Sequence, residues 1–119
     1  ALLIGGGIGV APVRALLEEA PSGTVAVVRA LSDADVVLRD ELEQIARERN
    51  AVVHVVTGDH ETDEGHDLLS PRHLRELVPD LADRDVYVCG PPGMTAAIAA
   101  AVRSAGVPSR YVHAERFAL

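Results

Sequence analysis

The sequence predicts an α/β fold: a Rossmann-like three-layer sandwich in which helices cover both faces of a five-stranded parallel sheet, with strand order 3-2-1-4-5. Apolar runs alternate with segments of helical periodicity, which is typical of right-handed β-α-β units. Hydrophobic residues make up 48% of the chain but aromatic residues only 3%, so the core is aliphatic, as suits buried parallel strands. Two glycine-rich turns, Gly5–Pro12 and Cys89–Met94, each follow an apolar run and precede a helical pattern.

The N-terminal third of the chain predicts a strand, a helix and a second strand. Leu2–Ile4 is a short apolar run that ends at glycines. Pro12–Ala20 has apolar residues at helical spacing, and its proline lies in the first turn, where the missing N–H costs nothing. The Pro-Ser-Gly sequence at 21–23 ends that helix, and Thr24–Val28 is a β-branched run that indicates the second strand.

The middle third predicts a helix, the third strand and a helix after a polar loop. Acidic residues lead Asp40–Arg49 and arginines close it, which complements the helix dipole, and Asn50 is a plausible stop. Ala51–Val56 is the third strand. The acidic stretch 57–69 indicates a loop, and the helix predicted at 71–78 then opens with Ser70 as its N-cap and a proline at its first position.

The C-terminal third predicts a strand, a helix and the last strand. Asp85–Cys89 is the fourth strand. An alanine-rich helix begins at residue 93 or 94, reaches residue 105 and is stopped by Gly106. Arg110–His113 is the predicted fifth strand.

Composition limits the class of protein. A chain of 119 residues suits one domain, residues 1–119. The formal net charge is −7, with 18 acidic residues against 11 basic ones, all arginine. This balance argues against a nucleic-acid partner, because phosphate contacts along a duplex need clustered positive charge. It leaves open a nucleotide site, which needs only helix N-termini and one or two arginines.

Cysteine content and hydropathy bear on the compartment. Cys89 is the only cysteine, which excludes an internal disulfide and suits a reducing, cytoplasmic setting. No apolar run approaches the roughly 20 residues of a membrane helix, and no signal peptide is evident. His60 and His66 have irregular spacing on a polar loop, so we expect no metal site. The abrupt start at a strand suggests a domain taken from a longer protein.

The first glycine turn predicts a phosphate cradle. Glycine lets the backbone approach a pyrophosphate closely and take positive φ, and the following helix adds N–H donors and its dipole. The spacing Gly7-x-Gly9-x-x-Pro12 departs from the usual G-x-G-x-x-G fingerprint, so a tight turn without a ligand is the alternative. We expect Gly7, Gly9 and Val10 to donate, within a binding segment comprising Gly6, Gly7, Ile8, Gly9, Val10, Ala11 and Pro12.

The end of the second strand predicts the contact with the adenosine ribose. A dinucleotide fold expects an acidic residue there to hold the 2′-hydroxyl. Arg29 and Ser32 suit a 2′-phosphate, whereas Asp33 suits a 2′-hydroxyl. NADPH and NADH therefore both stay open, and a solvated Arg29 is the alternative.

Four segments together resemble one known family. They are Gly5–Pro12, Asp35–Leu42, Cys89–Met94 and Glu115–Phe117. They are similar to the NAD(P)-binding domain of the ferredoxin–NADP reductase family, and most similar to the bacterial flavodoxin/ferredoxin reductase-like branch that includes ferric-reductase-like proteins. The resemblance covers essentially the whole chain. Its most specific part is the Cys-Gly-Pro-Pro-x-Met order in step with a C-terminal Glu-x-Phe.

The resemblance implies the NAD(P)H-binding half of a flavin-dependent oxidoreductase. In such families a β-barrel domain, absent from this chain, binds FAD or FMN, and hydride passes from the nicotinamide to the flavin. Electrons then reach a ferredoxin, flavodoxin, haem or ferric acceptor. The domain alone is then inactive without its flavin domain. Any contact of the full-length protein with a membrane is then made by segments outside this chain. A nucleotide-binding regulatory module without redox activity is the alternative.

The resemblance also implies roles for single residues. Cys89 lies beside the nicotinamide and Glu115 near the contact between nicotinamide and flavin, and these two are the catalytic candidates. Phe117 lies near the flavin ring, and Thr57 ends a ligand-facing turn. The nicotinamide side is completed by Gly90, Pro91, Pro92 and Met94. An inert buried thiol and a solvated tail are the alternatives, and Leu31 departs from the family, which often has arginine there.

Overall fold

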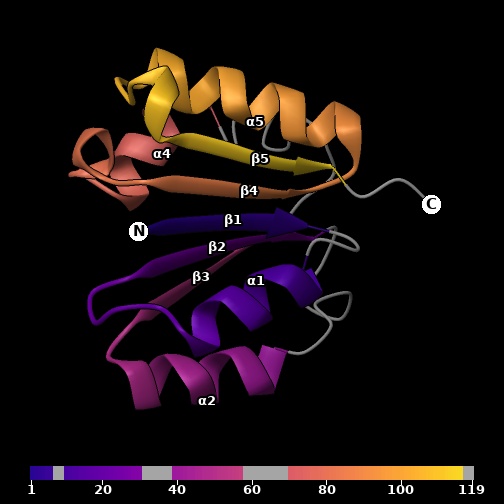
Figure 1. The fold of residues 1–119 in the computed structure, drawn as a ribbon, viewed down its shortest axis with the longest axis vertical. Coiled ribbons are helices and arrows are strands. Elements are labelled where there is room, and N and C mark those ends of the chain that lie inside the picture. The colour runs from indigo at the N-terminus through magenta and orange to yellow at the C-terminus, as the bar shows by residue number, and fades with distance from the viewer. Residues whose placement is uncertain (7–9, 31–38, 58–69, 117–119) are drawn as a thin grey trace.

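The computed structural model describes residues 1–6, 10–30, 39–57 and 70–116. Five parallel strands form one sheet in the order β3-β2-β1-β4-β5, which confirms the predicted order (Figure 1). The strands are β1 (Leu2–Gly6), β2 (Val25–Ala30), β3 (Val52–Thr57), β4 (Val86–Gly90) and β5 (Val112–Arg116).

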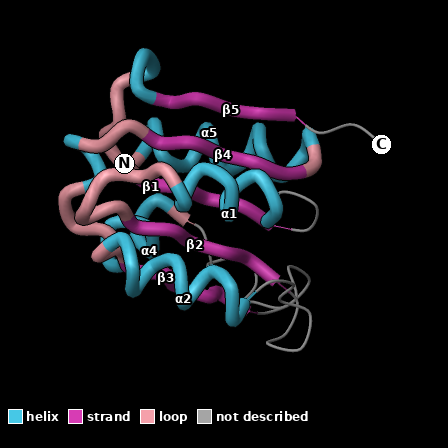
Figure 2. Tube along the Cα trace, turned by 60° about the horizontal axis from the view of Figure 1, so that its bottom comes forward, coloured by secondary structure: helices cyan, strands magenta, loops and turns pink. Residues whose placement is uncertain are grey.

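Helices cover both faces of the sheet, so the predicted three-layer α/β sandwich is confirmed. The described helices are α1 (Val10–Glu18), α2 (Arg39–Arg49), α4 (Pro71–Leu77) and α5 (Pro92–Ser104). Figures 1 and 2 show α1 and α2 together on one face and α4 and α5 on the other. Short 3₁₀ turns at Leu81–Asp83 and Ser109–Tyr111 precede β4 and β5.

Alternation along the central strands divides the core into two clusters. Leu2 and Ile4 of β1 pack with residues of α4 and α5, whereas Leu3 packs with Val13 and Leu17 of α1. Since successive side chains of a strand point to opposite faces, a strand buried on both faces is apolar at nearly every position. This is why the strands are recognisable as continuous aliphatic runs.

Residues with special backbone geometry end the helices at the amino edge of the sheet, where the strands begin. Asn50 follows α2 with a φ of 53°, and the N–H of Ala51 donates to the carbonyl of Ala46 at 2.8 Å, the pattern of a Schellman cap. Gly106 (φ 115°) follows α5 with the equivalent bond at 3.1 Å.

Ser70 caps the start of α4, its Oγ accepting a hydrogen bond from the N–H three residues later at 3.2 Å. All three stops and starts match the sequence prediction.

Arg84 fastens the same amino edge. One guanidinium nitrogen, Nη1, donates to the carbonyls of Ala1 and Gly23, at 3.0 and 2.9 Å, and Nε donates to Asp80 at 2.9 Å. The two carbonyls lie just before β1 and β2. One side chain therefore joins the starts of both strands to the segment that leads into β4.

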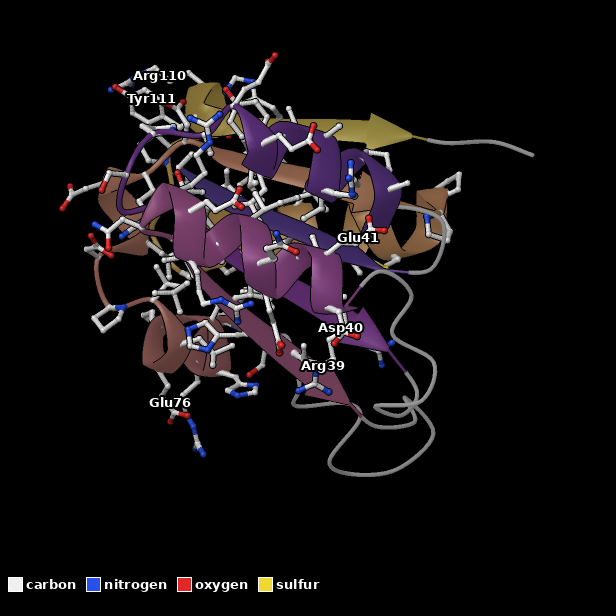
Figure 3. All side chains as sticks on the ribbon, turned by 90° about the horizontal axis from the view of Figure 1, so that it is seen from below. Arg39, Asp40, Glu41, Glu76, Arg110 and Tyr111 are labelled. Carbon is white, nitrogen blue, oxygen red and sulfur yellow. The ribbon has the colours of Figure 1, made fainter. Side chains whose placement is uncertain are left out.

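The prediction for the fifth strand is wrong in its position. Arg110 and Tyr111 lie in a 3₁₀ turn, with the guanidinium carbon 4.7 Å from the ring centroid; both are labelled in Figure 3. The N–H of Tyr111 donates to the carbonyl of Pro108 at 2.9 Å, which closes the turn. The strand starts two residues later than predicted and runs to Arg116, so it includes Glu115.

Candidate functional site

Two strand–helix junctions meet at the carboxyl edge of the sheet. β1 ends at Gly6 and α1 begins at Val10, whereas β4 ends at Gly90 and α5 begins at Pro92. β1 and β4 are neighbours, and the strand order runs in opposite directions from this pair. Such a switch point opens a crevice at the carboxyl edge, where doubly wound proteins bind nucleotides.

Two glycines end these strands, and one methionine lies against both. Gly5 pairs with Cys89, so the residues that follow, Gly6 and Gly90, end the two strands next to each other. A methyl group added at Gly6 would lie 3.0 Å from Met94 Sδ and 3.0 Å from the carbonyl oxygen of Arg29. A methyl group added at Gly90 would lie 3.0 Å from Met94 Cε. The thioether therefore fills the space that two ordinary side chains would occupy.

Thr95 fixes the second turn, and the sequence analysis missed it. Its side chain is 1% exposed, and its hydroxyl donates to the carbonyl of Gly90 at 3.1 Å. Its backbone N–H donates to the carbonyl of Pro91 at 2.9 Å. A threonine in the first turn of an alanine-rich helix was the only signal, because serine and threonine hydroxyls bond locally to backbone.

Cys89 lies on the other face of the sheet from Met94. It is 0% exposed and packs in the cluster with Val13 and Leu17 of α1. Strand alternation explains this: Val88 faces the α4–α5 layer, so Cys89 faces the α1–α2 layer. A ligand at the edge can touch this thiol only if the atoms that cover it move.

Register brings the two catalytic candidates together. Glu115 of β5 pairs with Cys89 of β4, so their backbones are adjacent one residue from the carboxyl end of each strand. On the far side of β1, Arg29 pairs with Gly6 and is partly exposed. Thr57 is the last residue of β3. The predicted residues that are described thus lie along one edge of the sheet.

The charges near this edge favour an anionic ligand at the N-termini of α1 and α5 over that of α2. The first turns of α1 and α5 carry no acidic residue, whereas that of α2 carries Asp40 and Glu41. Figure 3 shows Arg39 and Asp40 at the end of α2 nearest the carboxyl edge. Glu41 accepts a hydrogen bond from Arg14 of α1 at 2.6 Å, which neutralises one of the two acids. The helix N-termini beside β1 and β4 are therefore the ones suited to phosphate.

Residues 3–100 match the family model described as the oxidoreductase NAD-binding domain. The chain belongs to this family. Its membership confirms the resemblance to the NAD(P)-binding domain of ferredoxin reductases that the glycine turns and the C-terminal segment indicated.

Reductase components are among the curated relatives of this NAD-binding domain. The ferredoxin reductase component of 3-ketosteroid-9-alpha-monooxygenase from Mycolicibacterium smegmatis is 34% identical over 124 residues, which cover 98% of this chain and 33% of that protein. The glycine betaine monooxygenase reductase subunit of Pseudomonas aeruginosa is 28% identical over 98% of this chain and 34% of the relative. The chain thus spans about a third of the length of these relatives.

Solved structures share the fold. The flavohem-like FAD/NAD-binding domain of nitric oxide dioxygenase from Vibrio cholerae superposes with a TM-score of 0.78 at 24% identity, covering 98% of this chain and 50% of that one. The ferredoxin reductase in carbazole 1,9a-dioxygenase gives a TM-score of 0.70 at 20% identity, covering 98% and 35%. These likenesses support the doubly wound architecture of an NAD-binding domain.

Several predicted site residues fall outside the described part of the chain. They are Gly7, Ile8, Gly9, Ser32 and Phe117, and the histidines weighed as metal ligands, His60 and His66, also lie there. Within the described ranges, no three His, Cys, Asp or Glu side chains gather in a group that could hold a metal ion. Among the described helices, none has the length and apolarity to cross a membrane.

Proposed function

We propose that this NAD-binding domain holds NADH or NADPH across the crevice between β1 and β4 and presents its nicotinamide to a flavin carried by another domain. The observation that carries the proposal is the meeting of two glycine turns at the switch point, each leading into a helix whose first turn lacks acidic residues. Backbone N–H groups and helix dipoles there suit a pyrophosphate.

Different groups of residues would contact different parts of the dinucleotide. Gly7, Gly9 and Val10 would cradle the pyrophosphate, with Gly6, Ile8, Ala11 and Pro12 shaping the turn. Arg29 and Ser32 would face the adenosine ribose, and Thr57 lies further along the same edge. The nicotinamide side would be formed by Gly90, Pro91, Pro92 and Met94.

Once bound, the nicotinamide supplies a hydride, a reaction that needs positioning more than acid–base chemistry. The chain's own contribution is to orient the ring and to limit water around it. Cys89 would act from behind the site, as a buried part of the wall, rather than as an exposed thiol. Glu115 and Phe117 would lie where the nicotinamide meets the flavin.

The flavin domain and the electron acceptor belong to a longer protein in this proposal. Support comes from the relatives: this chain covers half of a solved domain named for both FAD and NAD, and about a third of monooxygenase reductase components. A chain that includes a flavin domain should copurify with FAD or FMN and reduce an artificial acceptor with NADH or NADPH. A chain of that length that takes up no flavin would overturn the redox part of the proposal.

Calorimetric titration of the domain with NADH, NADPH and ADP-ribose tests the binding site directly. We expect all three to bind, and Gly9→Val to abolish binding by filling the cradle while the fold is retained. No binding by any of the three at about millimolar concentration would refute the nucleotide site.

The preference between NADH and NADPH is set at the end of β2. Arg29→Gln should weaken NADPH binding and leave NADH binding unchanged if this arginine contacts a 2′-phosphate. Arg103→Gln, which removes the same charge from the exposed C-terminal turn of α5, is the matched control. Equal effects of the two substitutions on NADPH binding would show that only the net charge of the domain matters, and not a contact with Arg29.

A further inference from the structure

We propose that Met94 is a positioning residue for the nicotinamide side of the crevice, because its thioether sets the spacing between the two glycine turns. The inference rests on the proposed function above. Met94 belongs to α5, yet it approaches both Gly6 at the end of β1 and Gly90 at the end of β4. It is partly buried and packs against the core cluster beneath α5.

The backbone beneath Met94 is held firmly. Met94 is the third residue of α5, which starts at Pro92. Thr95, the next residue, hydrogen-bonds the carbonyl of Gly90 through its side chain and that of Pro91 through its backbone. The start of α5 and the Gly90–Pro91 turn therefore move as one unit, and the side chain of Met94 is the part of this unit that reaches β1.

The distances give the two glycines a different purpose from the one that their sequence suggests. A glycine-rich turn predicts close approach of a ligand. Here the space that a side chain at Gly90 would need is occupied by Met94, with Cε at 3.0 Å and Sδ at 3.3 Å from the added carbon. Gly90 therefore leaves room for the methionine, and the methionine in turn separates the second turn from the end of β1.

The two glycines should respond differently when Met94 is shortened. Of the three atoms closest to a methyl group added at Gly90, two belong to Met94. The third is the carbonyl oxygen of Gly6 at 3.4 Å, which is an ordinary contact distance. At Gly6 the carbonyl of Arg29 lies at 3.0 Å as well, and backbone cannot give way. Removing the thioether therefore relieves Gly90 but leaves Gly6 constrained.

A double-mutant cycle tests this geometry. Gly90→Ala should raise the unfolding equilibrium constant about threefold in the unsubstituted chain, because the end of the Met94 side chain must shift slightly, and should leave it unchanged in the Met94→Ala background. Gly6→Ala should remain costly in both backgrounds. Gly93→Ala, where no atom lies within 4 Å of the added methyl group, should cost nothing in either. An unchanged cost of Gly90→Ala in the Met94→Ala background would overturn the geometric basis.

Ligand binding tests the positioning role. Met94→Ala should weaken NADH binding about fivefold and change ADP-ribose binding less than about twofold, because only the nicotinamide side is displaced. Met94→Leu, which nearly conserves volume, should restore most of the NADH affinity. Equal losses for both ligands, or no loss, would overturn the inference while leaving the nucleotide site intact. Failure of the unsubstituted chain to bind either ligand would instead overturn the proposed function, and this inference with it.

The sequence offers a second readout that does not depend on affinity. Met94 is the only methionine, so a methyl-¹³C methionine label gives one resonance from the middle of the crevice. NADH should shift this resonance more than ADP-ribose does, because only NADH brings a nicotinamide ring to the second turn. Equal shifts from the two ligands would place Met94 on the adenosine and pyrophosphate side and overturn the inference.

Discussion

The hydroxyl of Thr95 is expected to hold the second turn, and Thr95→Val removes it with almost no change in shape. The side chain is 1% exposed and bonds the carbonyl of Gly90 at 3.1 Å. A net hydrogen bond contributes about 1 kcal/mol, and a buried carbonyl left without its partner raises the cost to about 1–3 kcal/mol. Threonine and valine have similar helix propensities, so the free energy of unfolding should fall by about that amount.

Urea and thermal unfolding measure this effect. For a chain of this size, 1–3 kcal/mol corresponds to a decrease in Tm of about 4–12 °C. Thr95→Ser keeps the hydroxyl and removes one methyl group, which costs about 0.8 kcal/mol, so the serine variant should be the more stable of the two. A valine variant at least as stable as the serine variant would refute the reasoning, since it would show that the hydrogen bond contributes no more than the buried methyl group.

Three further predictions concern other parts of the domain. Arg84→Ala should lower the free energy of unfolding by about 1–3 kcal/mol, measured by urea unfolding, because it frees the starts of β1 and β2; Arg84→Lys should recover only part of it. The hydrogen bond from Arg84 lowers the pKa of Asp80 below its usual value, so the stability that this carboxylate contributes is present above about pH 4 and is lost as pH falls further. Asp80→Asn should flatten this part of the dependence of the unfolding free energy on pH, measured between pH 7 and 3. An equal slope in the Asn variant and the unsubstituted chain would contradict the prediction. Cys89, with no exposed surface, should resist a thiol reagent in the folded chain and react in urea; rapid reaction without denaturant would show that the wall of the site opens.

The fold could be predicted from the sequence because its signals are local and agree with one another. Aliphatic runs alternate with helical periodicity, and right-handed crossovers then leave few possible strand orders. The strand ends were harder to predict. β1 extends through Gly5 and Gly6, and β2 through Arg29 and Ala30, because ladder hydrogen bonds continue where apolar side chains stop. Hydrophobicity marks what is buried rather than where backbone pairing ends.

The candidate site was predicted in outline, but the interactions within it were not. The two glycine turns follow from spacing alone. The contact of Met94 with both Gly6 and Gly90 depends on which face of two separate strands meets one helix, and no local pattern records that. Successive side chains of β4 point to opposite faces, so Val88 and Cys89 lie in different core clusters. The burial of Cys89 follows once the strand is known to be covered on both sides. The position of Glu115 required the turn at Pro108, which sequence periodicity did not reveal.

The helix stops and the bonds of Arg84 lie at the amino edge of the sheet, opposite the crevice, and this separation has an evolutionary consequence. Arg29, where the proposed preference between NADH and NADPH lies, is at the other edge from these bonds, so a lineage can change this residue without disturbing the contacts that join the starts of the strands. The same separation offers protein engineers a scaffold in which substitutions at Arg29 and stabilising substitutions at the amino edge act on different residues.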